Sequence, residues 1–303
     1  MGLSGALLLA SVLQDPFSEA LAEGRKHLEE HRAAEAEVLF RRASELRPSD
    51  GGARYFLGVA LLQQGKSEDA ARALEEAKGI SPRNAAVAFE LGNAYYSLER
   101  LDLAEEAFLE AAANAPSWDR IRLRLGWLYY SRVEIERAAA EFNRALGIAE
   151  SATGRYYLGL TEAALGELDA ACRSYRKALE LDSEMADVQV ALGRAYVRLN
   201  RAQDAESAFR SATALDPSQA EAHYQLGLLS LERGDDDASV KSFELALAAN
   251  PRHQSACYNL SLLLARRGDV ERADELRARF QEILAENQNR ARTRTAISRE
   301  PDR

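Results

Sequence analysis

The segment His27-Leu28-Glu29-Glu30-His31 carries the residue types with the strongest metal chemistry in the chain. It fits H-x-x-E-H, the inverted zinc-protease motif. Histidines four residues apart share one face of a helix, so both imidazoles can ligate one metal ion. Whether they do so depends on the elements that carry His27 and His31.

A second fragment, Gly65-Lys66-Ser67, is similar to the end of a phosphate-binding loop. That loop needs another glycine five residues before Gly65, where the chain has Ala60. The loop also follows a strand, whereas the residues before Gly65 predict a helix. We therefore predict no phosphate site here.

Nucleophilic catalysis finds no support in the residues. The chain has four histidines, and no Ser/His/Asp or Cys/His set can be proposed from them. The sequence therefore predicts no catalytic residue, no metal site and no cofactor, and we expect that the protein is not an enzyme.

Composition and charge narrow the class of protein. Apolar residues make up 47% and charged residues 29%, which indicates a well-buried core rather than global disorder. The formal net charge of -9 argues against a general nucleic-acid binder, because such a protein needs a basic surface. No apolar run reaches the roughly 18–20 residues of a membrane-spanning helix, so we expect neither a nucleic-acid partner nor a stable membrane span.

Small and large residues recur with one period along most of the chain. Glycines are spaced by 34, 34, 34, 33, 34 and 34 residues, at Gly24, Gly58, Gly92, Gly126, Gly159, Gly193 and Gly227. A large residue lies sixteen positions after each of them, at Phe40, Leu74, Phe108, Phe142, Tyr175, Phe209 and Phe243. A period of this length indicates stacked supersecondary units, each too small to bury its own apolar face.

Each unit is predicted to hold two helices of about a dozen residues. A short polar turn joins them, and in four units it contains a glycine that can take a positive φ: Gly65, Gly166, Gly234 and Gly268. Prolines near the boundaries end the second helices, at Pro48, Pro82, Pro116, Pro217 and Pro251. The periodic glycine marks a close approach of the two helices, and the large residue fills the space beside it.

This pattern resembles the tetratricopeptide repeat, and residues 85–118 match it best. They carry the framework Leu91, Gly92, Tyr95, Ala104, Phe108, Ala111 and Pro116. The resemblance implies an all-α fold, a right-handed superhelix of about eight stacked helix-turn-helix repeats. The predicted repeats are 17–50, 51–84, 85–118, 119–151, 152–185, 186–219, 220–253 and a degenerate cap, 254–287, in which Ser261 replaces the glycine and Arg277 the aromatic residue.

The positions of the histidines and cysteines within the repeats indicate structural roles for them. His27 falls in the tyrosine position of the first repeat and His31 in its turn, so we interpret them as a packing residue and a turn residue. Cys172 and Cys257 lie more than two repeats apart, too far for a disulfide, and are interpreted as packing residues. The fourth repeat is one residue short and lacks the proline, so we expect a local change in superhelical pitch after it.

The two ends fall outside the period. Residues 1–16 include the apolar run Leu3–Leu13, which is either the remnant of a signal peptide or a cap on the first helix. The first interpretation implies a periplasmic or secreted protein, and the second a cytoplasmic one. Residues 288–303 are basic and lack an apolar period, so we predict a disordered tail.

The resemblance also implies a binding surface. In this family the first helices line a concave groove, and carrying its positions over gives candidate partner-binding residues rich in Tyr, Trp and Arg, which dominate binding hot spots. They are Tyr55, Phe89, Asn93, Tyr96, Arg120, Trp127, Tyr130, Tyr156, Arg194, Tyr224 and, at the edge, Arg198.

The sequence therefore favours a scaffold or adaptor that binds a protein or peptide partner. Two alternatives stay open. One is a self-associating or structural module of a cell-envelope assembly complex, and the other is a regulatory subunit of a separate enzyme. The identity of the partner and the oligomeric state stay undetermined at this level.

Overall fold

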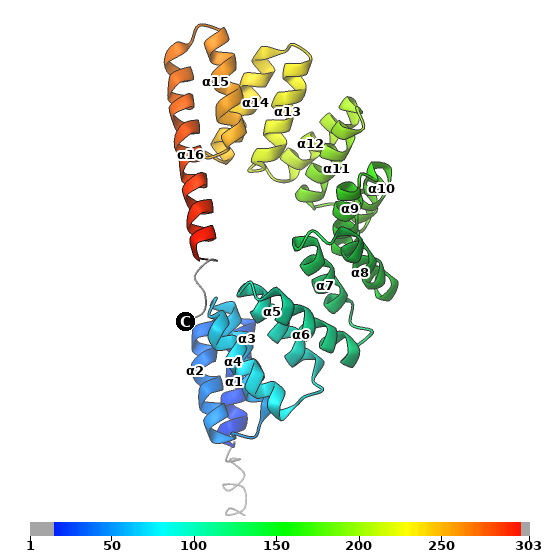
Figure 1. The fold of residues 1–303 in the computed structure, drawn as a ribbon, viewed down its shortest axis with the longest axis vertical. Coiled ribbons are helices and arrows are strands. Elements are labelled where there is room, and N and C mark those ends of the chain that lie inside the picture. Colours follow the sequence, from blue (N-terminus) through cyan, green and yellow to red (C-terminus); the bar gives the residue numbers. More distant parts are fainter. Residues whose placement is uncertain (1–14, 298–303) are drawn as a thin grey trace, which may run out of the picture. The chain divides into compact units, whose positions relative to one another are not determined.

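The computed structural model describes residues 15–297 of the chain. Within this range all regular structure is helical, and sixteen helices follow one another as helix-turn-helix pairs (Figure 1). The predicted all-α fold and the prediction of about eight stacked repeats are confirmed. The helices form two compact units, one ending at Glu150 and the other beginning at Ser151.

The first helices of the repeats are short and of nearly constant length. They are α1 Pro16–Glu29, α3 Gly51–Gln63, α5 Ala85–Ser97, α7 Asp119–Ser131, α9 Ala152–Leu165, α11 Ala186–Arg198, α13 Ala220–Glu232 and α15 Gln254–Arg266. The second helices are α2 Ala33–Leu46, α4 Ser67–Ile80, α6 Leu101–Asn114, α8 Ile135–Ile148, α10 Leu168–Leu181, α12 Ala202–Leu215, α14 Asp236–Ala249 and α16 Val270–Ile297.

Proline and glycine end the helices where the sequence predicts. Helix α4, for example, ends two residues before Pro82, because proline disfavours the helical conformation of the residue that precedes it. The four turn glycines have φ values of 73°, 84°, 76° and 85°. In the other four repeats a non-glycine residue takes this left-handed conformation: His31, Glu99, Val133 and Asn200.

The core of each repeat is built on the contact between its glycine and its large residue. A Cβ added to Gly92 would lie 2.5 Å from the Phe108 ring, and one added to Gly126 would lie 2.5 Å from the Phe142 ring. Five further repeats show the same contact. The predicted close approach of the two helices is therefore confirmed in the seven repeats that have the glycine.

The short fourth repeat coincides with the division of the chain into two compact units. Helix α8 ends at Ile148 without a proline, and α9 begins at Ala152 with Ser151 as its N-cap. The Ser151 hydroxyl accepts a hydrogen bond from the Gly154 amide at 3.1 Å. A side chain that satisfies a free amide of the first turn marks the start of the new helix.

The last repeat lacks both the glycine and the large aromatic residue of the repeat pattern. Ser261 is fully buried in place of the glycine, and its hydroxyl donates to the Tyr258 carbonyl at 2.7 Å. Arg277 is exposed in place of the aromatic residue, so no ring competes with the Ser261 side chain for space.

The C-terminal segment differs from its prediction. We predicted a disordered tail from residue 288, but α16 continues through this segment to Ile297. The segment has no Gly or Pro before Pro301, and five of its sixteen residues are arginine, which favours a helix without any apolar period. The apolar N-terminal run and residues 298–303 lie outside the described residues.

Candidate functional site

Three consecutive first helices of the first compact unit bring polar side chains together. Tyr55 lies on α3, Glu90 on α5 and Arg120 on α7. Burial raises the pKa of Tyr55, the negative charge of Glu90 raises it further, and Arg120 acts in the opposite direction. The three side chains are therefore within electrostatic reach of one another, although they come from three different repeats.

Glu90 is the partly buried acid at the centre of this arrangement. Its Oε2 accepts a hydrogen bond from Asn93 Nδ2 at 3.0 Å. Burial raises the pKa of the Glu90 carboxyl, while the Asn93 hydrogen bond and the charges of Arg120 and Arg124 oppose the shift. The net shift of the Glu90 pKa is upward. The effect of desolvation is therefore larger than that of the two nearby guanidinium groups, which do not contact the carboxylate.

Helix α7 presents a stripe of four side chains along one face, three of which are candidate residues. Arg120, Arg124, Trp127 and Tyr130 follow one another at intervals of four, three and three residues, which places them on the same side of a helix. The Trp127 and Tyr130 rings are stacked, with centroids 5.6 Å apart and planes 19° apart. We refer to Glu90, Asn93, Tyr96, Arg120, Arg124, Trp127 and Tyr130 as the α5–α7 patch.

Phe89 is not part of this surface, although the sequence placed it among the binding residues. Its side chain is 1% exposed. Its ring lies 5.9 Å from that of Phe108 and 5.0 Å from that of Trp118, and the Arg120 guanidinium lies 5.6 Å from its centroid. Phe89 is therefore a core residue that supports Arg120 from below.

In the second compact unit the candidate Tyr224 lies in a separate polar cluster. Its ring packs 4.8 Å from the His253 ring and 5.6 Å from the Phe243 ring, and its hydroxyl accepts from Asn259 Nδ2 at 3.1 Å. His253 Nε2 lies 3.4 Å from Glu221 Oε2. The hydrogen bond with His253 lowers the pKa of Glu221, and Gln225 and Arg194 contribute in the same direction against burial.

The remaining candidates of this unit have structural contacts of their own. Tyr156 packs against Tyr157 and Tyr175, with ring centroids 5.7 Å and 6.2 Å away. Arg198 donates a hydrogen bond to the Ala163 carbonyl at 2.7 Å, which joins α11 to α9. Arg194 is exposed.

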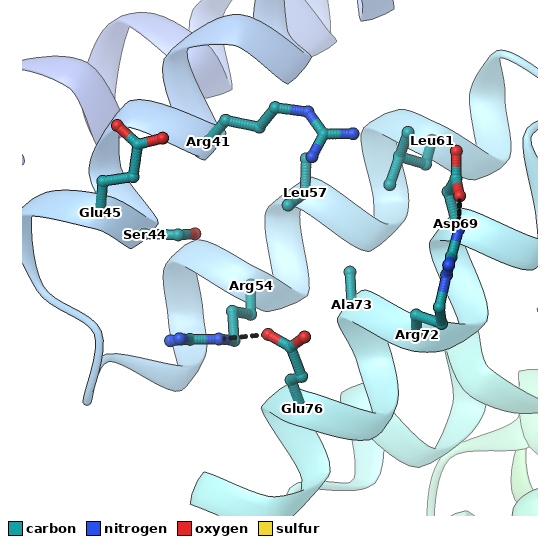
Figure 2. Close-up of a pocket in the computed structure, with 10 residues that line it drawn as sticks. All are labelled: Arg41, Ser44, Glu45, Arg54, Leu57, Leu61, Asp69, Arg72, Ala73 and Glu76. Carbon is teal, nitrogen blue, oxygen red and sulfur yellow. Dashed lines mark hydrogen bonds and ion pairs between the residues drawn. The ribbon is translucent and has the colours of Figure 1, made fainter.

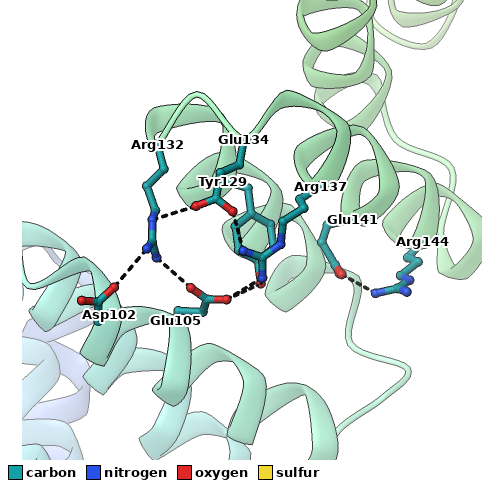
Figure 3. A network of polar contacts seen from close by, with 8 residues as sticks. All are labelled: Asp102, Glu105, Tyr129, Arg132, Glu134, Arg137, Glu141 and Arg144. Carbon is teal, nitrogen blue, oxygen red and sulfur yellow. Dashed lines mark hydrogen bonds and ion pairs between the residues drawn. The ribbon is translucent and has the colours of Figure 1, made fainter.

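A network of charged groups joins α7 to α6 and α8 (Figure 3). Glu105 of α6 accepts hydrogen bonds from Tyr129 at 2.9 Å, from Arg132 at 2.7 Å and from Arg137 at 2.6 Å. Arg132 also reaches Asp102, at 3.0 Å. Because these donors come from α7, from the turn that follows it and from α8, the carboxylate of Glu105 ties repeat 3 to repeat 4.

A cavity of about 440 Å³ lies between α2, α3 and α4 (Figure 2). Its wall includes the apolar side chains of Leu57, Leu61 and Ala73. Three arginines and three acids also line it, and Arg54 pairs with Glu76 at 2.8 Å while Arg72 pairs with Asp69. Because its arginines and acids are equal in number and two of the three arginines pair with acids of the cavity wall, this cavity selects no class of ligand.

Metal ligation and membrane insertion find no support in the described residues. Between residues 15 and 290 no three His, Cys, Asp or Glu side chains are grouped as metal ligands. His27 lies on α1 and His31 in the following turn at φ 57°, and Cys172 and Cys257 are free and buried. No helix in the described part of the chain is long and apolar enough to cross a membrane.

Sequence reasoning missed Glu90 and Arg124 as members of the patch. A signal for each was present. Glu90 is the single charged residue of α5, and Arg124 follows Arg120 by one helical turn. It also missed Glu221, His253 and Asn259, which the fold gathers from α13, from the turn before α15 and from α15.

The repeat profiles of one family match most of the chain. The tetratricopeptide repeat profile matches residues 21–85, 72–117, 89–154 and 190–251. Two related profiles, described as TPR repeat and tetratricopeptide repeat, match residues 159–200 and 254–279. No curated protein sequence matches the chain.

Solved structures with the same fold share little sequence identity with the chain. The APC/C hetero-tetramer Cut9–Hcn1 matches with a TM-score of 0.63 at 18% identity, over 82% of this chain and 52% of that chain. A tetratricopeptide repeat protein from Parabacteroides merdae ATCC 43184 matches with a TM-score of 0.63 at 15% identity, over 82% and 99%. YrrB, described as a TPR protein with an unusual peptide-binding site, matches with a TM-score of 0.51 at 21% identity, over 61% and 96%. At these identities the likeness concerns the fold alone.

Proposed function

The chain belongs to the tetratricopeptide-repeat family, and we propose that it is a non-catalytic scaffold that binds a peptide or partner protein along the first helices of its repeats. Such arrays typically mediate protein–protein interactions. The proposal concerns the particular surface used, which we place on the α5–α7 patch.

The observation that supports this proposal is the chemistry of the patch. It combines three partly buried aromatic side chains, Tyr96, Trp127 and Tyr130, with the exposed Arg120 and Arg124. Aromatic residues and arginine contribute most to binding energy at protein interfaces. The rings bury large areas, and a guanidinium pairs with a carboxylate through two parallel hydrogen bonds. The Glu105 network holds α7 in place, so the patch is organised before a partner arrives.

The test is affinity enrichment with the full chain as bait, followed by comparison of two double variants. Tyr96→Ala/Tyr130→Ala removes aromatic surface from the patch. The matched control, Leu103→Ala/Leu109→Ala, removes exposed apolar surface from α6, where these leucines are 41% and 45% exposed. We expect the same partner to be lost from the tyrosine variant and retained by the leucine variant. Retention by both variants contradicts the proposed surface.

Self-association is the alternative that one observation favours. On the first helix of the last repeat, Tyr258 and Leu262 are 47% and 41% exposed. Apolar residues on an end repeat suit stacking against a second copy. Light scattering over a range of concentrations distinguishes the two cases. A constant monomer mass removes this alternative, whereas a dimer that Leu262→Asp dissociates supports it.

A further inference from the structure

The arginines of the α5–α7 patch lack the acidic partners that other arginines nearby have. Arg132 and Arg137 each pair with Glu105 and Glu134. Arg120 and Arg124, in contrast, form no ion pair with any described residue. Both are exposed. A guanidinium pairs best with a carboxylate, which it can bind through two parallel hydrogen bonds.

The charge balance of the patch favours an acidic ligand. The chain as a whole carries a formal net charge of -9, yet the patch holds two arginines against one acid. That acid, Glu90, is already hydrogen-bonded to Asn93. Arg120 is held over the rings of Phe89 and Trp118, 5.6 Å and 6.0 Å from their centroids, so its guanidinium loses less freedom when a ligand binds.

The spacing along α7 sets the form of the ligand. The helical rise places the midpoint of the two arginines about 10 Å from the midpoint of the Trp127–Tyr130 stack. An extended chain covers this distance in about three residues. The stack offers contact to a large apolar side chain, and the two guanidinium groups offer contact to a carboxylate.

We propose that the α5–α7 patch recognises an extended peptide segment in which an acidic residue lies about three residues from a large apolar residue. Arg120 and Arg124 bind the carboxylate, and the Trp127–Tyr130 stack contacts the apolar side chain. This proposal rests on the proposed function and adds the chemistry of the partner. The negative net charge of the chain favours a peptide over a nucleic acid, whose binding requires a basic surface of greater extent.

The test uses a random peptide library displayed on phage, selected on the full chain and on three double variants. Arg120→Gln/Arg124→Gln removes the two positive charges of the patch. Arg42→Gln/Arg83→Gln removes two exposed arginines, on α2 and in the α4–α5 turn, that form no ion pair with another described residue. Tyr96→Ala/Tyr130→Ala removes aromatic surface and leaves both arginines in place, so it reports on the use of the patch whether or not the partner is acidic. One enriched peptide is then synthesised with its acidic residue intact or replaced by the amide, and its Kd is measured by fluorescence anisotropy.

We expect the wild-type chain and Arg42→Gln/Arg83→Gln to enrich peptides with the acidic–apolar spacing. Arg120→Gln/Arg124→Gln loses that preference and binds the synthetic peptide at least about tenfold more weakly, as does the wild-type chain with the amide peptide. The two losses are not additive, because both remove the same interaction.

Other outcomes overturn the proposal at different levels. Enriched peptides without acidic residues, or an acidic preference that survives Arg120→Gln/Arg124→Gln, overturn the partner chemistry. If Tyr96→Ala/Tyr130→Ala still abolishes binding in that case, the proposed function stands. If no peptide is enriched, or if none of the three variants changes binding, both the partner chemistry and the proposed function are overturned. Displacement of the peptide by a single-stranded oligonucleotide at lower concentration than by free peptide assigns the patch to nucleic acid instead.

Discussion

A Cβ added to Gly92 would lie 2.5 Å from two carbons of the Phe108 ring. The ring is 1% exposed, so it has no free space into which it can move. The same contact joins Gly24 to Phe40 and Gly227 to Phe243. The periodic glycine therefore exists to let two helices approach, and its conformational freedom has no role, because it lies within a helix.

Gly92→Ala tests this contact. We expect a loss of about 1–2 kcal/mol in the free energy of unfolding, because overpacking a core outweighs the gain in helix propensity. Gly79→Ala is the matched control. A Cβ at Gly79 meets nothing within 4 Å, so this variant gains up to about 1 kcal/mol. Urea unfolding followed by circular dichroism measures both, and equal effects contradict the prediction.

Val133→Gly is expected to stabilise the protein. Val133 has a φ of 63° and is 77% exposed, so glycine relieves an unfavourable left-handed conformation without removing buried contacts. That conformation costs a β-branched residue on the order of 1–2 kcal/mol, part of which is offset by the greater freedom of glycine in the unfolded chain. Asn200→Gly, at φ 58°, is expected to change stability less, because asparagine tolerates this region. Thermal unfolding of both variants measures the two changes in stability. We expect the increase to be larger for Val133→Gly than for Asn200→Gly.

Glu37→Gln is expected to weaken the protein at neutral pH and not at acid pH. Glu37 of α2 bonds Lys66 at 2.7 Å and Gln64 at 3.0 Å, and so joins repeat 1 to repeat 2. The bond from Lys66 lowers the pKa of Glu37 to about 2, with Arg41 and Gln64 acting in the same direction against burial. Because the folded-state pKa lies below the unfolded value of about 4.3, this stabilisation is complete above pH ~4.3 and is lost as the pH falls toward 2.

The expected loss for Glu37→Gln at pH 7 is about 1 kcal/mol, since Lys66 and Arg41 are 46% and 51% exposed and solvent screens them. Chemical unfolding from pH 7 to pH 2 measures it. Glu35→Gln, at an exposed position on the same helix, is the control. A wild-type advantage that persists at pH 2 argues that the Gln substitution acts by packing instead.

Glu90→Gln, in contrast to Glu37→Gln, is expected to raise the free energy of unfolding at neutral pH. Burial raises the pKa of Glu90 above its unfolded value, so the fold favours the protonated acid. Its ionisation therefore costs stability as the pH rises from the unfolded pKa of about 4.3 through the higher folded pKa. Glutamine resembles the protonated acid, and its side-chain oxygen still accepts from Asn93.

We expect Glu90→Gln to exceed the wild type in unfolding free energy at pH 7 and to equal it below pH ~4. Glu106→Gln, at an exposed position of α6, is the control for removing one negative charge from the chain. A destabilised Glu90→Gln at pH 7 shows that the charges of Arg120 and Arg124 outweigh desolvation.

The sequence by itself determined the repeat, the helix ends and the packing inside each repeat. These features depend on contacts that recur every 34 residues, such as Gly92 with Phe108. Because each repeat stacks on a similar neighbour, the environment of a framework position is nearly the same throughout, and one residue type predicts one role. The left-handed turns at Gly65 and Gly166 could be predicted for the same reason. The left-handed turn at Val133 could not, because valine does not indicate a positive φ.

The tertiary structure decided which surface residues come together. The repeat frame placed Phe89 on the binding surface, but its aromatic neighbours Phe108 and Trp118 bury it. The frame gave no reason to join Glu90 with Arg124, which lie on different helices. Surface side chains differ from one repeat to the next, so their contacts depend on the particular neighbour that the stack brings beside them. For that reason the fold was readable from residue spacing, whereas the charge and shape of the α5–α7 patch required the folded chain.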